Sequence, residues 1–223
     1  MKKSLGAVIL LVVIGGSVIY EYEYSPKAKY QKGLHYYKEK NYKKALPLFE
    51  EAAEQGYAPA EKYIPRIKYQ KGLRYYKDEN YKEALPLFEE AAEHHYAPAE
   101  NHLGYMYLNG LGVPQDYSKA VYWFKKAAKQ GYAKGEYNLG DMYQHGLGVR
   151  QNYSKAVYWY KKAAEQGFAK AENNLGTMYA EGLGVPQDYS KAVYWLKKSA
   201  EQGYATAKAN LQYLELAHLF GGY

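Results

Sequence analysis

The chain has 223 residues, 48% of them hydrophobic, which is enough to bury a substantial core. Its formal net charge is +7 and it has no cysteine, which excludes disulfides, thiol catalysis and a lipid-modified cysteine. Tyrosine is unusually frequent, with 30 copies against 5 Phe and 3 Trp, and its apolar ring and polar tip suit half-buried helix surfaces and binding faces.

Residues 1–24 combine a basic tip with an apolar segment. Lys2 and Lys3 precede an apolar run, residues 5–20, that only glycine and serine interrupt. The run is longer than a typical signal-peptide core and slightly short for a membrane span of about 20 residues, and no Ala-x-Ala cleavage site follows it. We expect an uncleaved hydrophobic anchor helix, with a cleaved signal peptide as the alternative.

The lysines at the N-terminus set the expected location of the rest of the chain. Positive charges before an apolar segment favour a cytoplasmic N-terminus, so the residues after the segment should lie outside. We therefore expect a protein anchored in the cytoplasmic membrane with its folded part in the periplasm. If the segment is cleaved, the protein should be secreted to the periplasm.

Residues 26–96 contain two related units with the pattern of a helix–turn–helix. Two segments occur in both units: YQKGL at residues 30–34 and 69–73, and ALPLF at residues 45–49 and 84–88. In the second unit the small residue Gly72 lies 12 residues before Ala84. This spacing resembles the tetratricopeptide repeat, in which small residues let paired helices approach closely. We expect two tetratricopeptide-like helix pairs, with Pro47 and Pro86 inside the second helices.

Residues 97–203 contain three longer units with a period of 36 residues. The segment YSKAVYW occurs at residues 117–123, 153–159 and 189–195, and the pattern LGxMYxxGxGV occurs at residues 103–113, 139–149 and 175–185. Gly104 precedes Ala120 by 16 residues, so the connection between the two helices is longer than in the first two units. Together these motifs resemble the Sel1-like repeat, a relative of the tetratricopeptide repeat.

Self-similarity at a fixed period of this size is the signature of a solenoid. A single unit is too small to bury its own apolar face, so neighbouring units must stack. The sequence therefore predicts an all-α, right-handed superhelical solenoid of antiparallel helix pairs, tetratricopeptide-like and then Sel1-like, preceded by the N-terminal hydrophobic helix. Residues 204–223 lack the Gly-x-Gly-Val loop and are expected to form a C-terminal capping helix and a tail.

Polar residues and glycines mark the ends of the expected second helices. Before the first residue of each stands an Asn or Asp whose side chain can accept from the free N–H groups of the first turn. These residues are Asn41, Asn80, Asp116, Asn152 and Asp188. Glycine follows four of the five helices, where a left-handed residue is favoured, and His95 takes this place in the second unit. The tryptophans of the second helices, Trp123, Trp159 and Trp195, are expected to pack between units.

No arrangement of residues points to catalysis, a cofactor or a metal ion. The six histidines are scattered without metal-ligand spacing. Ser118-Lys119 and its two copies superficially resemble a Ser–Lys dyad, but neighbouring residues on a helix do not face each other. The Lys-Lys pairs near the ends of second helices complement the helix dipole, and no nucleic-acid motif accompanies them. We expect a non-enzymatic protein that binds neither nucleic acid nor a small-molecule substrate.

Positions that vary between the three Sel1-like units are candidates for partner binding. In each first helix one stripe changes at i, i+4 and i+7, which places its residues on one helix face. The nine residues are Asn101, Tyr105, Leu108, Tyr137, Asp141, Gln144, Asn173, Thr177 and Ala180. First helices line the concave side of superhelical stacks. The stripe is therefore either idle solvent surface or the surface that contacts a partner.

The family resemblance implies a function in protein interaction. For bacterial Sel1-like proteins it implies adaptor roles in envelope assembly, secretion or host contact, and for some a role as periplasmic immunity proteins. We therefore expect a non-enzymatic scaffold of the bacterial envelope that binds a protein or peptide in its concave groove. A glycan- or peptidoglycan-binding protein that uses a tyrosine-rich groove is the alternative.

Overall fold

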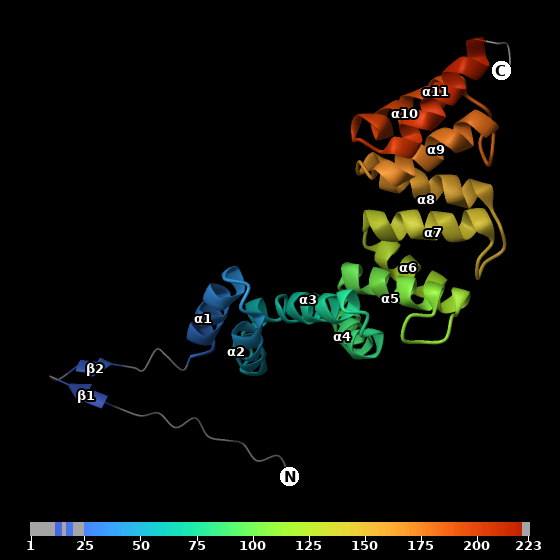
Figure 1. Ribbon diagram of the computed structural model, residues 1–223. Helices are drawn as coiled ribbons and strands as arrows, with labels where there is room; N and C mark the ends of the chain where they lie inside the picture. Colours follow the sequence, from blue (N-terminus) through green and yellow to red (C-terminus); the bar gives the residue numbers. More distant parts are fainter. Residues whose placement is uncertain (1–11, 15–16, 20–24, 220–223) are drawn as a thin grey trace. The chain divides into compact units, whose positions relative to one another are not determined.

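The computed structural model describes residues 12–14, 17–19 and 25–219 (Figure 1). The chain forms two compact units, residues 1–71 and 72–223, and the boundary falls inside helix α3. The α-helices of the described residues are α1 (Pro26–Lys38), α2 (Tyr42–Glu54), α3 (Ile64–Lys77), α4 (Tyr81–Glu93), α5 (Ala97–Asn109), α6 (Tyr117–Lys129), α7 (Ala133–His145), α8 (Tyr153–Glu165), α9 (Ala169–Glu181), α10 (Tyr189–Glu201) and α11 (Ala205–Leu219). The prediction of an all-α repeat solenoid built from helix pairs is confirmed.

The N-terminal apolar segment does not form the predicted helix where the structure describes it. Strand β1 (Val12–Ile14) pairs antiparallel with strand β2 (Ser17–Ile19). Valine and isoleucine dominate both strands, and Gly15-Gly16 separates them in the sequence, a combination that favours a hairpin. The rest of the predicted anchor helix lies outside the described residues. No helix that the structure describes is both long enough and apolar enough to cross a lipid bilayer.

In the first unit, α1 packs closely against α2 at a glycine. A Cβ atom on Gly33 would lie 3.0 Å from the ring of Phe49, which is fully buried. That ring stacks on Tyr63 with a centroid separation of 4.7 Å, and Ile67 of α3 belongs to the same buried cluster. A 3₁₀ helix, Ala58–Ala60, links α2 to α3. The small residue thus permits the close helix pairing that the tetratricopeptide-like spacing predicts.

In the second unit each helix contacts the next along the chain from α4 to α11, and Figure 1 shows this stack in green to red. Paired helices again approach at glycines. A Cβ atom on Gly104 would lie 2.6 Å from the ring of Phe124, and one on Gly140 would lie 2.8 Å from the ring of Tyr160. Ala120 and Phe124 are fully buried between the helices. These side chains therefore form the inner packing of each repeat.

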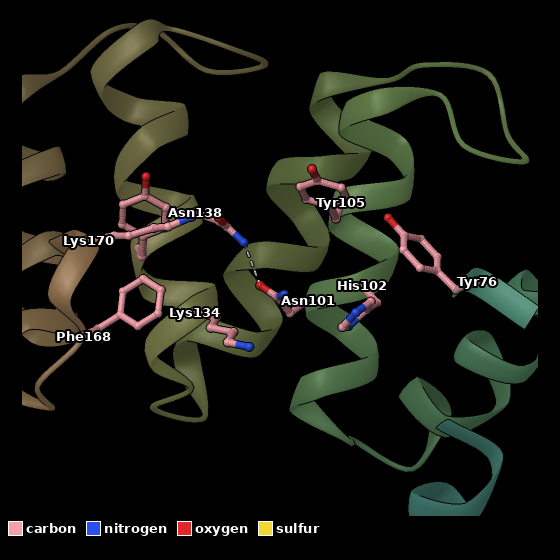
Figure 2. A pocket seen from close by; sticks show the side chains of 9 residues that line it. Tyr76, Asn101, His102, Tyr105, Lys134, Asn138, Phe168 and Lys170 are labelled. Carbon is pink, nitrogen blue, oxygen red and sulfur yellow. Dashed lines mark hydrogen bonds between the residues drawn. The ribbon is translucent and has the colours of Figure 1, made fainter. Parts of the chain in front are cut away.

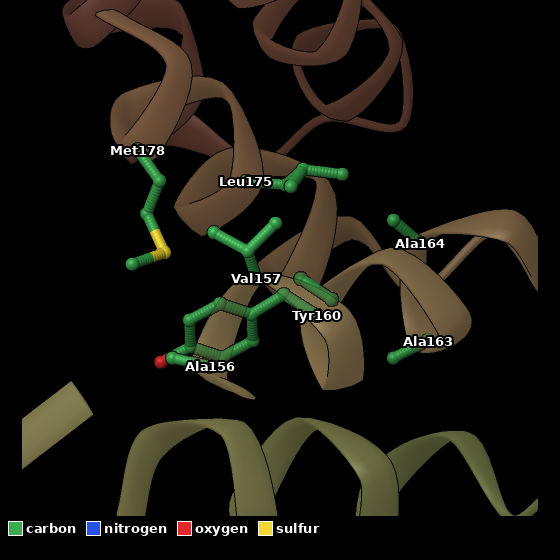
Figure 3. Packing of buried hydrophobic residues seen from close by; sticks show 8 residues of the cluster. Ala156, Val157, Tyr160, Ala163, Ala164, Leu175 and Met178 are labelled. Carbon is green, nitrogen blue, oxygen red and sulfur yellow. The ribbon is translucent and has the colours of Figure 1, made fainter. Parts of the chain in front are cut away.

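The core continues from one repeat to the next. Figure 3 shows the cluster of α8 and α9, in which Tyr160, Leu175 and Met178 are buried. Trp195 of the following repeat packs against this cluster, and Trp159 packs against the equivalent cluster of α6 and α7. The predicted packing of tryptophans between repeats is confirmed for these two residues, whose side chains are half-buried.

The Gly-x-Gly loops of the later repeats also pack on the preceding repeat. Gly148 has a φ of +67°, and a Cβ atom there would lie 2.4 Å from the backbone of Tyr117. In the next repeat the hydroxyl of Ser154 donates to the carbonyl of Gly184 at 3.1 Å. Both the left-handed backbone and the close approach require glycine. The longer loop therefore adds a contact between neighbouring repeats.

The second helices begin and end at the predicted polar residues and glycines, with one departure among the N-terminal caps and one among the C-terminal glycines. The side chains of Asp116 and Asn152 accept from the N–H groups of the first turn at 2.9 Å. The side chain of Asn80 makes no such hydrogen bond. Gly131 has a φ of +75°, and His95, which replaces glycine, is held in the left-handed region at a φ of +54°. The caps thus explain where most second helices begin and end.

A buried carboxyl group lies near the start of each first helix of the later repeats. Glu100 is fully buried, the side-chain amide of Gln130 donates to its Oε2 atom at 2.7 Å, and Lys126 Nζ lies 3.8 Å from its Oε1 atom. Burial raises the pKa of Glu100, and Lys126 and Gln130 oppose this effect. The same amide-to-carboxylate bond recurs between Gln166 and Glu136 and between Gln202 and Glu172. We refer to these as the Glu–Gln pairs.

Candidate functional site

A pocket of about 280 Å³ lies on the first helices of consecutive repeats (Figure 2). Its lining residues come from α3, α5, α7 and α9 and from the residue that precedes α9. They are Tyr76, Asn101, His102, Tyr105, Lys134, Tyr137, Asn138, Phe168 and Lys170. We call this the first-helix pocket, and its volume suits one or two side chains of a larger ligand.

Aromatic side chains form two walls of the first-helix pocket. On one side the rings of Tyr76 and His102 meet edge to face, with centroids 5.7 Å apart, and Tyr105 is 44% exposed. On the other side Tyr137 contacts Phe168 at a centroid distance of 5.3 Å. Burial raises the pKa of Tyr76 and of Tyr137 to about 12, so both hydroxyls remain protonated at neutral pH. The walls therefore offer flat apolar faces with neutral polar tips.

Two asparagine side chains bridge α5 and α7 within the pocket. The side-chain amide of Asn138 donates to Asn101 Oδ1 at 2.8 Å, as Figure 2 shows. The bond recurs between α11 and α9, where Asn210 donates to Asn173 Oδ1 at 2.9 Å. Asn101 is 6% exposed, whereas Asn138 is only half-buried. Because this bond uses a donor of Asn138, its side-chain carbonyl stays able to accept from a ligand.

The charged groups of the pocket are lysines. Lys134 and Lys170 both line it and are exposed. Burial, with Lys134 nearby, lowers the pKa of His102, whose Nδ1 donates to the carbonyl of Pro98 at 3.0 Å, so the imidazole is neutral at pH 7. No three His, Cys, Asp or Glu side chains among the described residues are grouped so as to hold a metal ion. The pocket is equipped for binding by apolar contact, hydrogen bonds and positive charge.

The nine predicted partner-binding residues are divided between several environments. Asn101, Tyr105 and Tyr137 line the first-helix pocket. Thr177 and Ala180 line a second pocket, of about 190 Å³, with residues of α11. The stripe is not one exposed face, because Asn101, Asn173 and Ala180 are buried and Leu108 packs against the core of α6 and α7.

Asp141 and Gln144, the remaining predicted residues, surround a buried hydroxyl. The Tyr160 hydroxyl donates to Gln144 Oε1 at 2.7 Å and lies 3.4 Å from Asp141 Oδ1. Burial raises the pKa of Tyr160 far above its usual range. The equivalent residues of the neighbouring repeats, Phe124 and Leu196, are apolar. The polar residues of the middle repeat therefore compensate for a hydroxyl that its neighbours do not have.

Six residues of the first-helix pocket were not predicted: Tyr76, His102, Lys134, Asn138, Phe168 and Lys170. Several lie beside the predicted stripe on the same helices. Their positions also vary, since Pro98 corresponds to Lys134 and His102 to Asn138 in the 36-residue register. A wider comparison of the variable positions could have found them. Tyr76 corresponds to Leu108 when Gly72 is aligned with Gly104, so extending the stripe into the preceding tetratricopeptide-like unit would have included it.

The arrangement of repeats matches a known family. The family model of the Sel1 repeat matches residues 16–57, 67–96, 97–132, 133–168 and 169–204. These matches cover most of the chain. The chain belongs to the Sel1 repeat family. Sel1 and tetratricopeptide repeat proteins are generally protein-interaction scaffolds and are typically not enzymes.

Solved structures of Sel1 repeat proteins resemble this one. A protective antigen of uropathogenic Escherichia coli is 37% identical with a TM-score of 0.67; the match covers 84% of this chain and 40% of that one. A Sel1 repeat protein from Oxalobacter formigenes is 38% identical with a TM-score of 0.62, over 64% of this chain and 59% of that one. This chain thus spans between two and three fifths of their lengths.

Yeast Tom70 shares only the fold. It is 15% identical with a TM-score of 0.55, and the match covers 87% of this chain and 40% of Tom70. The comparison with curated proteins found no match. The family assignment therefore rests on the repeat model and on the Sel1 structures.

Proposed function

We propose that this Sel1 repeat protein is a scaffold that binds an extended segment of a partner protein along its first helices. The observation that carries the proposal is the first-helix pocket, which has aromatic walls and an accessible amide on the first helices of consecutive repeats. Scaffold function is general in this family, which supports the proposal. A partner segment crossing α5, α7 and α9 would contact three repeats at once.

The lining residues suit an extended peptide. A side chain placed between Tyr105 and Tyr137 would bury apolar area against rings on both sides, and enclosed aromatic residues dominate binding energy in many interfaces. The Asn138 side-chain carbonyl can accept from a backbone N–H of the segment. A peptide held by side chains of several helices needs no exposed strand edge, so a helical stack is sufficient as the receptor.

The envelope of a bacterium is the location that we propose. The apolar N-terminal sequence with its lysines supports export, and the E. coli relative is described as a protective antigen, which supports a position accessible from outside the cell. An adaptor in secretion and an immunity protein would each bind their partner in the first-helix pocket. A protease applied to intact cells with permeabilised outer membranes would digest the repeats if they are periplasmic and spare them if they are cytoplasmic.

A glycan is the second candidate ligand. Exposed tyrosines such as Tyr105 can stack on sugar rings, which favours a peptidoglycan strand or another envelope glycan. The half-buried amide of Asn138 could bind a sugar hydroxyl. The two candidates differ in the expected ligand, so one set of variants can separate them.

The test uses the purified full chain against a phage-displayed library of random peptides and against isolated peptidoglycan. We expect selected peptides to bind the wild type and to lose about tenfold in affinity, or about 1.4 kcal/mol, with Tyr105→Ala. Tyr122→Ala is the matched control, because Tyr122 is 55% exposed on a second helix and should change affinity less than about twofold. Tyr105 is preferable to Tyr137 as a probe, because Tyr137 packs against Tyr160 and Phe168.

The outcomes are distinct. Loss of peptide binding with Tyr105→Ala but not with Tyr122→Ala supports the scaffold. If no peptide is selected and the protein binds peptidoglycan in a way that depends on Tyr105, the result supports a glycan as the ligand. Peptides whose binding depends on Tyr122 and not on Tyr105 would place the interaction on the outer helices and overturn the proposed site.

A further inference from the structure

The first-helix pocket is positive although three of the helices that form it, α5, α7 and α9, are not; the fourth, α3, which contributes Tyr76, contains five basic residues and no acidic one. Helix α5 contains Glu100 as its one charged residue apart from histidine, and α7 and α9 each contain one lysine against two acidic residues. Nevertheless, the lining residues include two lysines and no carboxylate. The acidic residues of these helices must therefore be directed elsewhere.

The glutamates of the first turns are directed into the repeats. Glu100, Glu136 and Glu172 are at most 2% exposed and accept from the glutamines of the Glu–Gln pairs. Lys198 Nζ lies 3.5 Å from Glu172 Oε1, as Lys126 does from Glu100 at 3.8 Å. These carboxyl groups are occupied by second-helix side chains and do not reach the pocket.

The other acidic residue of α7 is also engaged away from the lysines. Asp141 lies two turns after Lys134 in the same helix, and His145 Nε2 is 3.4 Å from its Oδ1 atom. Asp141 Oδ1 lies near the Tyr160 hydroxyl as well. In α9 the second acidic residue, Glu181, is the last residue of the helix and lines the second pocket. Neither residue compensates the charge of the first-helix pocket.

Lys134 and Lys170 have no structural partner that explains them. Among the described residues neither forms an ion pair with a carboxylate. Both lie in the first turn of a helix, where a positive charge opposes the helix dipole. Among the later repeats the equivalent positions are Pro98 and Thr206, so lysine is not a general feature of this position there. The first two units carry Lys27 and Arg66 at this position when their first-helix glycines are aligned. Two lysines at one pocket without a carboxylate make it positively charged and so complementary to an anionic ligand group.

We propose that the first-helix pocket selects a partner segment with an acidic side chain, whose carboxylate Lys134 and Lys170 bind. This inference rests on the proposed scaffold function and adds the charge of the ligand to it. The aromatic walls would hold the residues next to the acidic one, and the neutral His102 would add no competing charge. A carboxylate between two lysines is bound by charge-assisted hydrogen bonds, which are about twice as strong as neutral ones.

The experiment compares peptide selections on three forms of the full chain. The probe is the same phage-displayed library of random, unmodified peptides, read by sequencing. The wild type should enrich Asp or Glu at one position of the selected motif. Lys134→Gln with Lys170→Gln should abolish that enrichment. Lys125→Gln with Lys197→Gln is the matched control: it removes the same charge from exposed positions on second helices, and the enrichment should persist.

One selected peptide is then measured in solution. Replacing its acidic residue by the amide should weaken binding to the wild type about tenfold and binding to the Lys134→Gln, Lys170→Gln variant less than about twofold. Raising the salt concentration should weaken the wild-type complex and affect the variant complex less. These results would support a carboxylate bound by the two lysines.

A failure of the charge inference can be distinguished from a failure of the scaffold function. Peptides that require Tyr105 but show no acidic preference would overturn the charge inference and leave the scaffold function standing. A preference for acidic peptides that the control lysine variant also loses would assign it to the net charge of the protein and overturn the inference. If no peptide is selected by the wild type, the scaffold function itself fails and the charge inference fails with it.

Discussion

The first two helix pairs and the three later repeats share their inner packing and differ in how neighbours contact each other. In both regions a first-helix glycine lies under a second-helix ring, as Gly33 does under Phe49 and Gly104 under Phe124. The residues just before the ring differ: Pro47-Leu48 in the first region corresponds to Tyr122-Trp123 in the second. Pairing of two helices and stacking of successive pairs are therefore encoded by different residues.

The connections within the pairs differ in the same way. In the first two pairs a three-residue turn places a non-glycine residue in the left-handed region, Lys40 at a φ of +58° and Glu79 at +59°. In the later repeats a longer loop uses glycine for this conformation, and the loop glycine lies against the preceding repeat. The short turn closes a helix pair, whereas the long loop also joins the pair to its neighbour. Three substitutions test this difference.

The largest effect is expected from the loop glycine. Gly148→Ala places a Cβ atom against the Tyr117 backbone and forces a left-handed alanine, which should destabilise the protein by on the order of 3 kcal/mol. Gly131→Ala is the control, because its φ is +75° but nothing lies within 4 Å of the added atom, so about 1 kcal/mol is expected. Urea unfolding measures both. Equal losses would mean that the loop contact between repeats contributes nothing.

A smaller loss is expected from the tryptophan that packs between repeats. Trp159→Ala removes a half-buried ring from the core of α6 and α7 and should cost about 2 kcal/mol, less than for a fully buried ring. Tyr158→Ala, at an adjacent side chain that is 53% exposed, should change stability by about 0.5 kcal/mol or less. Thermal unfolding compares them. A Trp159→Ala protein as stable as the wild type would remove the second-helix tryptophans from the stacking contacts.

The smallest effect is a gain of stability in the first region. Lys40→Gly relieves a left-handed conformation that lysine disfavours, and the higher chain entropy of glycine offsets part of this, so a net gain of about 0.5–1 kcal/mol is expected. Lys43→Gly, in the first turn of α2, should instead cost up to about 1 kcal/mol. Chemical denaturation of both variants gives the sign. A loss with Lys40→Gly would show that the short turn depends on the lysine side chain.

Much of the fold follows from the sequence because each repeat can be compared, position by position, with its copies in the same chain. An Asn or Asp before Tyr153 and its equivalents predicts where second helices begin, and the cap hydrogen bonds of Asn152 and Asp116 agree. The N-terminal segment was mispredicted where it is described, because an apolar run with no repeat gives no period. Its β-branched residues, such as Val12 and Ile19, are compatible with a strand as well as with a membrane helix.

The candidate site was only partly predictable. Variation at i, i+4 and i+7 finds one helix face but not how deeply neighbouring helices cover it. Asn101 is buried under Asn138, whereas Tyr105, one turn later, is 44% exposed. The two lysines of the pocket escape such a comparison because they stand outside the stripe. Their significance depends on where Glu136 and Glu172 point, which spacing alone does not give.

The Glu–Gln pairs have a consequence for how such arrays change in length. Each buried carboxyl group and its glutamine belong to the same 36-residue repeat: Glu100 and Gln130 lie 30 residues apart, and so do Glu172 and Gln202. A duplication or deletion of one whole repeat therefore never separates a buried acid from its partner. Gene rearrangements that add or remove repeats leave no buried carboxyl group without its hydrogen-bond donor. Copy number can change during evolution while every copy brings its own glutamine for the buried acid.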